Sequence, residues 1–365
     1  ALYCPVKIKD FKPTSRHHII DRFTTVHDWS PNDFTDTGQP SVNDDVLRGL
    51  IGKVPMAEEL AEIFYLAKRL GQIATGKESW LNHVAEDGAI HHRLNVGGTI
   101  SGRCAHSNPN IAQVPKVVAV PAFNKDGTFN AKAFDENGVA MPWAIPSYKD
   151  GKPKGAILTG REGKHGYDCR RLFYVPKGWR LVGCDLSGIE LRCLANLTAP
   201  HDGGFLINQI LEGDIHEVNR EAAGLQTRDQ AKTLIYALVY GAGFAKIGSI
   251  VDPLAPHDQQ IITGKALIEQ FYAKLPGLGA VVKSIKKQAK RGWVEGLDGR
   301  RLLVRAMHAA LNLRLQSDGA LISKKWLLRS DDLFHEQGWK HGWSGDYAFL
   351  GYIHDEIQVA VRVEH

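Results

Sequence analysis

The chain has 365 residues, of which 43% are hydrophobic and 23% are charged, so it belongs with globular proteins rather than disordered or fibrous ones. No apolar run reaches the roughly 18 residues of a membrane span, and we expect no membrane partner. The formal net charge of +5 permits a nucleic-acid partner without requiring one.

The five cysteines are odd in number, scattered and without a CxxC pair, which argues against a disulfide framework or a structural zinc site. The five are Cys4, Cys104, Cys169, Cys184 and Cys193. Cysteines without a disulfide pattern favour a reducing compartment. The first residues carry neither an initiator Met nor the apolar run of a signal peptide. We therefore expect a processed or excised piece of a longer protein.

Helical periodicity dominates residues 1–75, with a polar loop over 35–45. Residues 95–116 are too rich in Gly, Asn and Pro for regular elements. Residues 117–165 also have a loop-like composition, and a structureless stretch of that length predicts an insertion or a functional loop.

The second half of the chain predicts more regular structure. A strand over 179–185 ends in an acid, and helical periodicity starts again at 189. Further helices are predicted over 204–225, 227–240, 264–292 and 307–330, with an Asp-Gly hairpin over 294–305. The tail predicts strands over 347–353 and 357–363, joined by a turn at His354–Glu356. The residues expected on its buried face are Ile357, Val359, Val361 and Val363.

Three acids stand at the ends of predicted strands. Asp185 closes the 179–185 strand, and Asp355 and Glu356 lie in the last turn. Singly, each has an ordinary interpretation, because strand-end acids cap helices and turn acids are usually solvated. Together, two strand-end carboxylates from distant positions can meet at one sheet edge. Such a pair suits Mg²⁺ held jointly with substrate phosphates.

A helix starting at Thr227 is indicated by its capping-box spacing to Gln230. Four side chains recur every fourth residue on one face: Arg228, Lys232, Tyr236 and Tyr240. Cations four apart repel by roughly 0.2–0.5 kcal/mol, so this row gains nothing for local folding. It predicts a face that receives a triphosphate and a base. The alternative is a solvated basic face that runs into packed aromatics.

Five segments, in the same order, resemble those of family A DNA polymerases, above all the polymerases of T7-like bacteriophages. They are "GTISGRCAHSNPNIAQVP", "DLSGIELRCLANL" (motif A), "RDQAKTLIYALVYGAG" (motif B), "HAALNLRLQSDGALI" and "HDEIQ" (motif C). The resemblance covers nearly the whole chain. It implies an α+β right-hand polymerase fold with an antiparallel palm sheet, mostly helical fingers and a partial thumb.

The resemblance also implies domain bounds. They are a partial thumb at 1–75, palm at 76–195, fingers at 196–300, and palm again at 301–365 with a truncated C-terminus. Residues 117–165 form an inserted loop region that is longer than the family pattern leads us to expect. We assign that region no role.

The catalytic residues implied by the family are Asp185, Asp355, Lys232 and Glu356. Asp185, Asp355 and the backbone carbonyl of Leu186 are the expected ligands of two Mg²⁺ ions, which activate the primer 3′-hydroxyl and stabilise the leaving pyrophosphate. Lys232 neutralises the triphosphate and protonates pyrophosphate. Glu356 has a supporting role.

The dNTP contacts implied by the family are Glu190, His216, Arg228, Lys232, Tyr236 and Tyr240. Glu190 matches a steric gate against the ribose 2′-hydroxyl, and we expect Tyr236 as the partner that a buried Glu needs. Tyr236 replaces the Phe of some relatives, which predicts efficient incorporation of dideoxynucleotides. Tyr240 is expected near the template base. Taken alone, His216 has the commoner interpretation of an ordinary surface or core histidine.

The DNA contacts implied by the family are Arg103, Asn110, Gln113, Arg170, Arg171, Asn312, Gln316 and His354. Most are expected in the minor groove, where every correct base pair presents acceptors. Arg170 and Arg171 are expected at the DNA backbone, and His354 at the turn or the primer end.

The predicted function is DNA-templated DNA synthesis from dNTPs in phage replication, by a nucleotidyltransferase of the host bacterial cytoplasm. Its partners are primer–template DNA and dNTPs, and a processivity factor cannot be read from this chain. One alternative is a single-subunit RNA polymerase of the same superfamily, which Glu190 and the "HDE" turn match poorly. The other is a catalytically inactive DNA-binding fragment.

Overall fold

A computed structural model describes residues 8, 10–31, 34, 38–253 and 255–365, so Cys4 and part of the predicted polar loop lie outside the described residues. The chain divides into two compact units, residues 1–93 with 106–111 and residues 94–105 with 112–365. The unit boundaries fall at three points of the chain, within the short strands β1 (Arg93–Asn95) and β2 (Ala105–Ser107) and within the 3₁₀ turn η3 (Ile111–Gln113). None of the described helices is long and apolar enough to cross a membrane.

The first unit is helical, as the periodicity predicts. Its helices begin at side-chain caps where the sequence offers them, because Ser15 and Asn43 accept the free N–H groups of the first turns. Ile19, Phe23 and Leu47 are fully buried in its core. The elements are α1 (Arg16–Val26), α2 (Asp44–Gly49), α3 (Ala57–Leu70), a π-helical turn η1 (Gly71–Thr75) and a 3₁₀ turn η2 (Leu81–His83).

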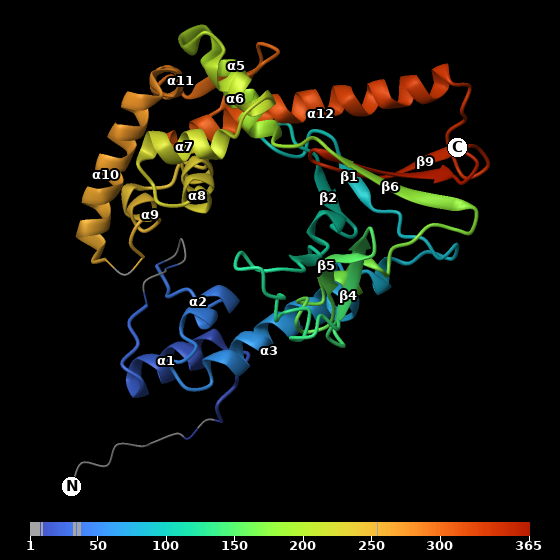
Figure 1. The fold of residues 1–365 in the computed structure, drawn as a ribbon, viewed down its shortest axis with the longest axis horizontal. Helices are drawn as coiled ribbons and strands as arrows, with labels where there is room; N and C mark the ends of the chain where they lie inside the picture. Colours follow the sequence, from blue (N-terminus) through green and yellow to red (C-terminus); the bar gives the residue numbers. More distant parts are fainter. Residues whose placement is uncertain (1–7, 9, 32–33, 35–37, 254) are drawn as a thin grey trace. The chain divides into compact units, whose positions relative to one another are not determined.

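The second unit contains the sheet that carries the predicted acids. Strands β6 (Trp179–Asp185), β10 (Glu356–Arg362) and β9 (Tyr347–Ile353) are antiparallel in that order, which confirms the three predicted strands. Helix α12 (Ala310–Glu336) lies along this sheet (Figure 1), where Trp326 and Leu327 pack with Tyr352 and Ile357.

The predicted alternation of β10 is only partly right. Ile357 and Val359 are buried as expected, but Val363 is 46% exposed. Ala360, expected on the open face, is fully buried. Alanine is small and this strand is central, so its neighbours on β6 and β9 cover it.

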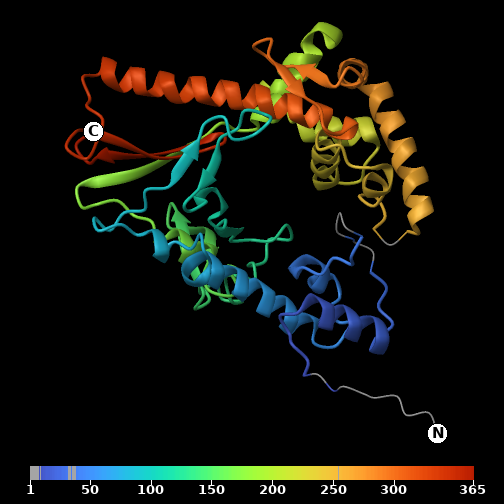
Figure 2. The same ribbon diagram turned by 180° about the vertical axis from the view of Figure 1, so that it is seen from behind.

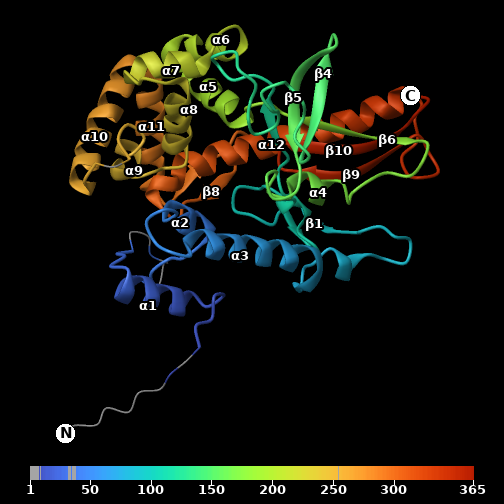
Figure 3. The same ribbon diagram turned by 60° about the horizontal axis from the view of Figure 1, so that its bottom comes forward.

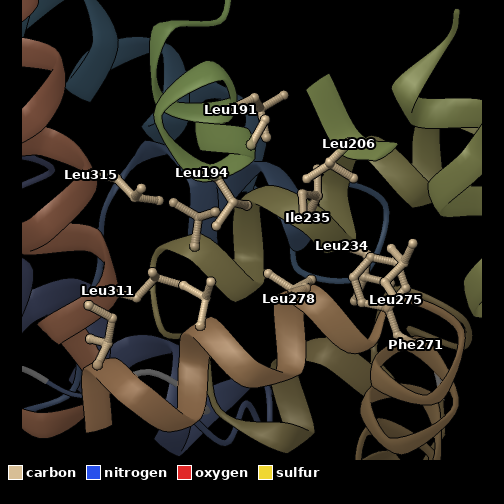
Figure 4. Packing of buried hydrophobic residues seen from close by; sticks show 14 of the residues in the cluster. Leu191, Leu194, Leu206, Leu234, Ile235, Phe271, Leu275, Leu278, Leu311 and Leu315 are labelled. Carbon is tan, nitrogen blue, oxygen red and sulfur yellow. The ribbon is translucent and has the colours of Figure 1, made fainter. Parts of the chain in front are cut away.

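A helical lobe forms a large part of the second unit (Figure 2), around a leucine-rich core that includes residues from α5, α6, α8, α10, α11 and α12 (Figure 4). Its elements are α5 (Ile189–Asp202), α6 (Phe205–Leu211), α7 (Ile215–Ala223), α8 (Arg228–Val239), α9 (Phe244–Gly248), α10 (His257–Lys274), α11 (Pro276–Ala289), the hairpin β7 (Trp293–Glu295) and β8 (Arg301–Leu303), and a 3₁₀ turn η4 (Met307–Ala309). The predicted Asp-Gly hairpin is confirmed.

Two of the predicted helices are in fact pairs. The segment 204–225 breaks because Asp214 accepts the N–H groups of His216 and Glu217 and so caps a new helix, α7. The segment 264–292 breaks at Leu275, because Pro276 has no N–H to continue α10 and instead starts α11.

The expectation that 117–165 lacks regular elements is wrong. Strands β3 (Val118–Pro121), β5 (Lys152–Leu158) and β4 (Ala144–Lys149) form an antiparallel sheet in that order. Phe134 and Leu158 lie in the small core of this sheet. Proline in three short strands concealed the pattern, yet each occupies a position that needs no ladder N–H, as Pro146 does in the edge strand β4. A 3₁₀ turn η3 (Ile111–Gln113) and helix α4 (Gly166–Arg170) flank the sheet in sequence.

Candidate active site

The carboxylates of Asp185 and Asp355 meet where β6 ends and the β9–β10 turn begins. Asp185 is the last residue of β6, and its cross-strand partner is Glu356. The Leu186 N–H donates to the Asp355 carbonyl at 2.9 Å, which fixes the two segments side by side. The pKa of Asp185 is raised, first by burial and then by the negative charge of Asp355. The predicted convergence of these acids is therefore present in the fold.

The donor set at this edge fits a hard divalent cation. Both side chains offer only oxygen, and the charge of Asp355 raises the pKa of Asp185, a repulsion that a cation between them removes. Leu186 is next in the chain and packs its side chain on the lobe core, so its backbone is held at the site. Among the described residues no group of three or more His, Cys, Asp or Glu side chains forms a metal cage. One or two carboxylates are what Mg²⁺ usually takes from a protein when its other ligands are water or phosphate oxygens.

The turn that carries Asp355 is held from behind by α12. The buried Ser323 hydroxyl donates to the His354 carbonyl at 2.7 Å, and His354 has a left-handed φ of 59°. The pKa of His354 is lowered by burial and then by the charge of Arg103. Glu356 is the first residue of β10 rather than part of the turn, and it accepts a hydrogen bond from Gln358. Ser323 went unnoticed in the sequence, where its only signal is a hydroxyl at a buried position of a long helix.

Glu190 is buried at the start of α5, as expected, but its predicted partner is wrong. Its carboxylate accepts from Arg103 Nη2 at 2.8 Å and from the Tyr240 hydroxyl at 3.1 Å, whereas the expected Tyr236 makes no such bond. Tyr236 lies in the last turn of α8 and Tyr240 is the residue that ends the helix, and only Tyr240 reaches the carboxylate. The pKa of Tyr236 is raised by burial and by the Glu190 charge, so its ring lies nearby.

Two tyrosine rings line one face of α8. Tyr236 and Tyr240 stack with centroids 6.5 Å apart and planes at 21°, and the His216 ring approaches Tyr236 at 6.5 Å. The pKa of His216 is lowered by burial and by Arg228, so the neutral imidazole is favoured. Its Nδ1 is buried and has no hydrogen-bond partner among the described residues. The predicted row of side chains exists, with His216 beside it.

Arg228 forms an ion pair with Asp214, a residue that was not predicted from the sequence. Its guanidinium donates through Nε and Nη2 to both oxygens of Asp214, at 2.7 and 3.1 Å. This pairing lowers the pKa of Asp214 to about 2. The capping box of Thr227 and Gln230 is confirmed, and Lys232 lies exposed one turn further along α8. Asp214 thus fixes Arg228 at the end of the face.

The predicted DNA contacts are spread over several elements. Arg170 donates to the Pro115 carbonyl at 3.0 Å, and the Arg171 guanidinium lies 5.9 Å from the Tyr167 ring centroid. Asn312 and Gln316 stand on α12, as expected. The side-chain oxygen of Asn312 is buried without a hydrogen-bond partner among the described residues. Asn110 directly precedes the 3₁₀ turn η3, and Gln113 is the last residue of that turn.

Comparison with known proteins identifies the family. The model of DNA polymerase family A matches residues 3–365. The DNA-directed DNA polymerase of Enterobacteria phage T3 is 39% identical over all of this chain and 48% of its own length, and that of Escherichia phage T7 is 38% identical with the same coverage. The chain thus spans about half the length of these curated relatives.

A solved structure supports the same fold. It is described as the POL domain of Pol1 from M. smegmatis in complex with DNA primer-template and dNTP, with a TM-score of 0.69 and 21% identity. The match covers 97% of this chain and 56% of that one. The expected α+β polymerase fold is confirmed, and the chain belongs to DNA polymerase family A.

Proposed function

We propose that this chain is the polymerase portion of a DNA-templated DNA polymerase that extends a primer 3′-hydroxyl with dNTPs and releases pyrophosphate. The observation that carries the proposal is the meeting of Asp185 and Asp355 at one sheet edge, beside the row of nucleotide-type contacts on α8. The 38–39% identity to phage DNA polymerases gives no support to the RNA polymerase alternative. We assign residues 1–75 to a partial thumb, 76–195 and 301–365 to the palm, and 196–300 to the fingers.

Asp185, Asp355 and the Leu186 carbonyl are the residues proposed to hold two Mg²⁺ ions. Bound there, such ions supply an activated primer hydroxyl and stabilise the charge that develops on the phosphates. The sheet keeps the two carboxylates in register, since Leu186 and the turn are joined by a backbone hydrogen bond. Glu356 supports the site from the first position of β10.

The nucleotide is proposed to lie along α8. Arg228 and Lys232 face the phosphates, with His216 as a neutral donor beside them. The stacked rings of Tyr236 and Tyr240 offer the sugar and base an apolar wall. Glu190 closes the wall as a fixed carboxylate, because Arg103 and Tyr240 hold it in place.

Primer–template DNA is the proposed partner, in line with the primer-template and dNTP named for the M. smegmatis structure. Gln113, Asn312 and Gln316 are the proposed minor-groove donors, together with Asn110 of the first unit and with Arg103. Arg170, Arg171 and His354 are proposed to contact the backbone and the primer end. The phage relatives favour action in the cytoplasm of a bacterial host.

Primer extension in Mg²⁺ tests this function, with dNTPs compared against rNTPs. We expect extension with dNTPs only, and Glu190→Ala should lower the preference for dNTPs by about ten- to a hundredfold, since the carboxylate no longer crowds a 2′-hydroxyl. Glu212→Ala, an exposed acid of the same lobe, is the matched control. A preference for rNTPs in the unaltered chain, or DNA binding without any extension, would support one of the two alternatives instead.

Tyr236 is expected to set the response to chain terminators. Its hydroxyl can fill the space of a missing 3′-hydroxyl, so dideoxynucleotides should be incorporated almost as well as dNTPs. Tyr236→Phe should raise discrimination against dideoxynucleotides by about ten- to a hundredfold, because it removes a hydroxyl whose hydrogen bond to a charged group is worth a factor of that size. Competition between ddNTP and dNTP in single-nucleotide extension measures this, and a preference of several hundredfold in the unaltered chain would contradict it.

A further inference from the structure

The β4–β5 hairpin ends in a tight turn with an unusual set of side chains. Asp150 and Gly151 both have positive φ, 51° and 73°, the conformation of a two-residue turn that matches the twist of paired strands. β3 pairs only with Gly155–Leu158, so the tip formed by residues 148–153 extends beyond the third strand. Figure 3 shows β4 and β5 side by side up to this narrow turn. The tip therefore has a defined conformation before binding, so that binding a ligand costs it little conformational entropy.

The charges at this tip work against its own stability. Lys149 and Lys152 are direct cross-strand partners, and like charges placed opposite each other destabilise an antiparallel pair. Lys154 adds a third exposed cation, against the single carboxylate of Asp150. No ion pair joins these lysines to an acid within the described part of the chain. Beside them, Tyr148 is 60% exposed, more than a folding role requires.

Edge protection explains only part of this pattern. Proteins place Lys and Pro on edge strands to prevent pairing with another sheet. That accounts for Pro146 and Lys149, which lie in the edge strand β4. It does not account for Lys152 standing directly opposite Lys149, where two like charges destabilise the hairpin, or for the exposed ring of Tyr148.

We propose that this tip, together with the adjacent Lys154, is a binding site for single-stranded DNA, and that its ligand is the uncopied template strand. The second half of the proposal rests on the proposed polymerase function. Lysines at this spacing neutralise successive phosphates, and an exposed aromatic ring stacks on bases, which are accessible only where the strand is unpaired. An anion between Lys149 and Lys152 also removes the repulsion that the free hairpin contains.

The test compares two double variants of the full chain. Lys149→Ala/Lys152→Ala removes the opposed pair, while Lys125→Ala/Lys132→Ala removes two exposed lysines from the same segment away from the tip. Binding of fluorescein-labelled oligo-dT, and of primer–template with a long or no 5′ template overhang, is followed by anisotropy over a salt series. For oligo-dT and the long overhang, we expect the tip variant to bind about five- to tenfold more weakly, with a salt slope reduced by about 1.4, or 0.7 for each phosphate contact. The control pair and the substrate without overhang should change little.

Tyr148 provides a second, uncharged variant. Tyr148→Ala should weaken oligo-dT binding by at least about fivefold, and Tyr148→Phe should retain it because stacking needs only the ring. The lysine variant should melt at the same temperature as the unaltered chain or higher, since its like-charge pair is gone, and this excludes misfolding as the cause of lost binding.

Each outcome bears on one proposal or the other. If the tip variants bind all probes like the unaltered chain, or lose affinity equally without the overhang, the single-strand site is wrong. If the unaltered chain binds oligo-dT through the tip but does not extend primers, the site stands and the polymerase function falls. If the unaltered chain extends primers and the tip variants bind DNA as well as the control pair does, the polymerase function is supported and the single-strand site is wrong.

Discussion

Asp185→Ala will lower the rate of primer extension by at least about a thousandfold while primer–template binding stays nearly unchanged. Metal ions held at such a site contribute several kcal/mol of transition-state stabilisation, and each 1.36 kcal/mol is a factor of ten in rate. Asp185 lies at the end of β6 beside Asp355, so its loss removes half of the carboxylate pair without disturbing the strand. Single-turnover extension gives the rate, and fluorescence anisotropy gives the DNA affinity.

The controls for this result distinguish the loss of Asp185 from the loss of any other carboxylate. Asp332→Ala removes an exposed carboxylate from α12 and should leave the rate unchanged. Glu356→Gln should cost much less than Asp185→Ala, because Glu356 is proposed only to support the pair. Extension that survives Asp185→Ala at more than a tenth of the normal rate means that the two acids do not form the catalytic site.

Arg314→Leu will destabilise the second unit by about 3–5 kcal/mol. Arg314 Nε donates to Asp318 at 2.7 Å, and the two side chains are only 11% and 1% exposed. Asp318 also accepts the Leu297 N–H at 2.9 Å, which ties the β7–β8 turn to α12. Burial raises the pKa of Asp318, and the charge of Arg314 opposes that rise. Without Arg314 the carboxylate is left buried and uncompensated, the costly way to break such a pair.

Urea unfolding measures this loss against two matched variants. Arg314→Leu/Asp318→Asn removes the charge but keeps the acceptor for Leu297, and should recover most of the stability. Arg329→Leu breaks an ion pair with Glu336 on the same helix, where the side chains are 57% and 55% exposed, and should cost less than about 1 kcal/mol. If Arg314→Leu and Arg329→Leu lost the same amount of stability, the buried Asp318 carboxylate would not be strained by the loss of Arg314, and this explanation would be wrong.

Local chemistry explains what could be predicted from the sequence. The strand 179–185, the capping box at Thr227 and the Asp-Gly hairpin depend on neighbouring residues, and each forms as expected. The meeting of Asp185 and Asp355 followed from two strand ends and one sheet. What failed depended on tertiary placement. Nothing near Glu190 in sequence indicates that Arg103, 87 positions earlier, is its ion-pair partner.

Two other differences have the same origin. The strands of 117–165 are short and contain proline, so their pattern shows only once β5 pairs on both sides. Asp214 was not identified from the sequence, because its cap of α7 interrupts a predicted helix and its ion pair requires α7 and α8 to pack so that Arg228 reaches it. Propensity gives the element, and packing decides which side chains meet.

The strand order β6-β10-β9 has a consequence for synthesis of the protein. β10 lies between the other two strands, yet Glu356 follows its cross-strand partner Asp185 by 171 positions. At about 5–20 residues per second, β6 waits roughly 9 to 34 s for that partner. Throughout this time a strand that carries Trp179, Leu181 and Val182 has both edges unpaired, the kind of segment that can pair with another chain and aggregate. The nascent chain should therefore depend on chaperones until β10 emerges from the ribosome.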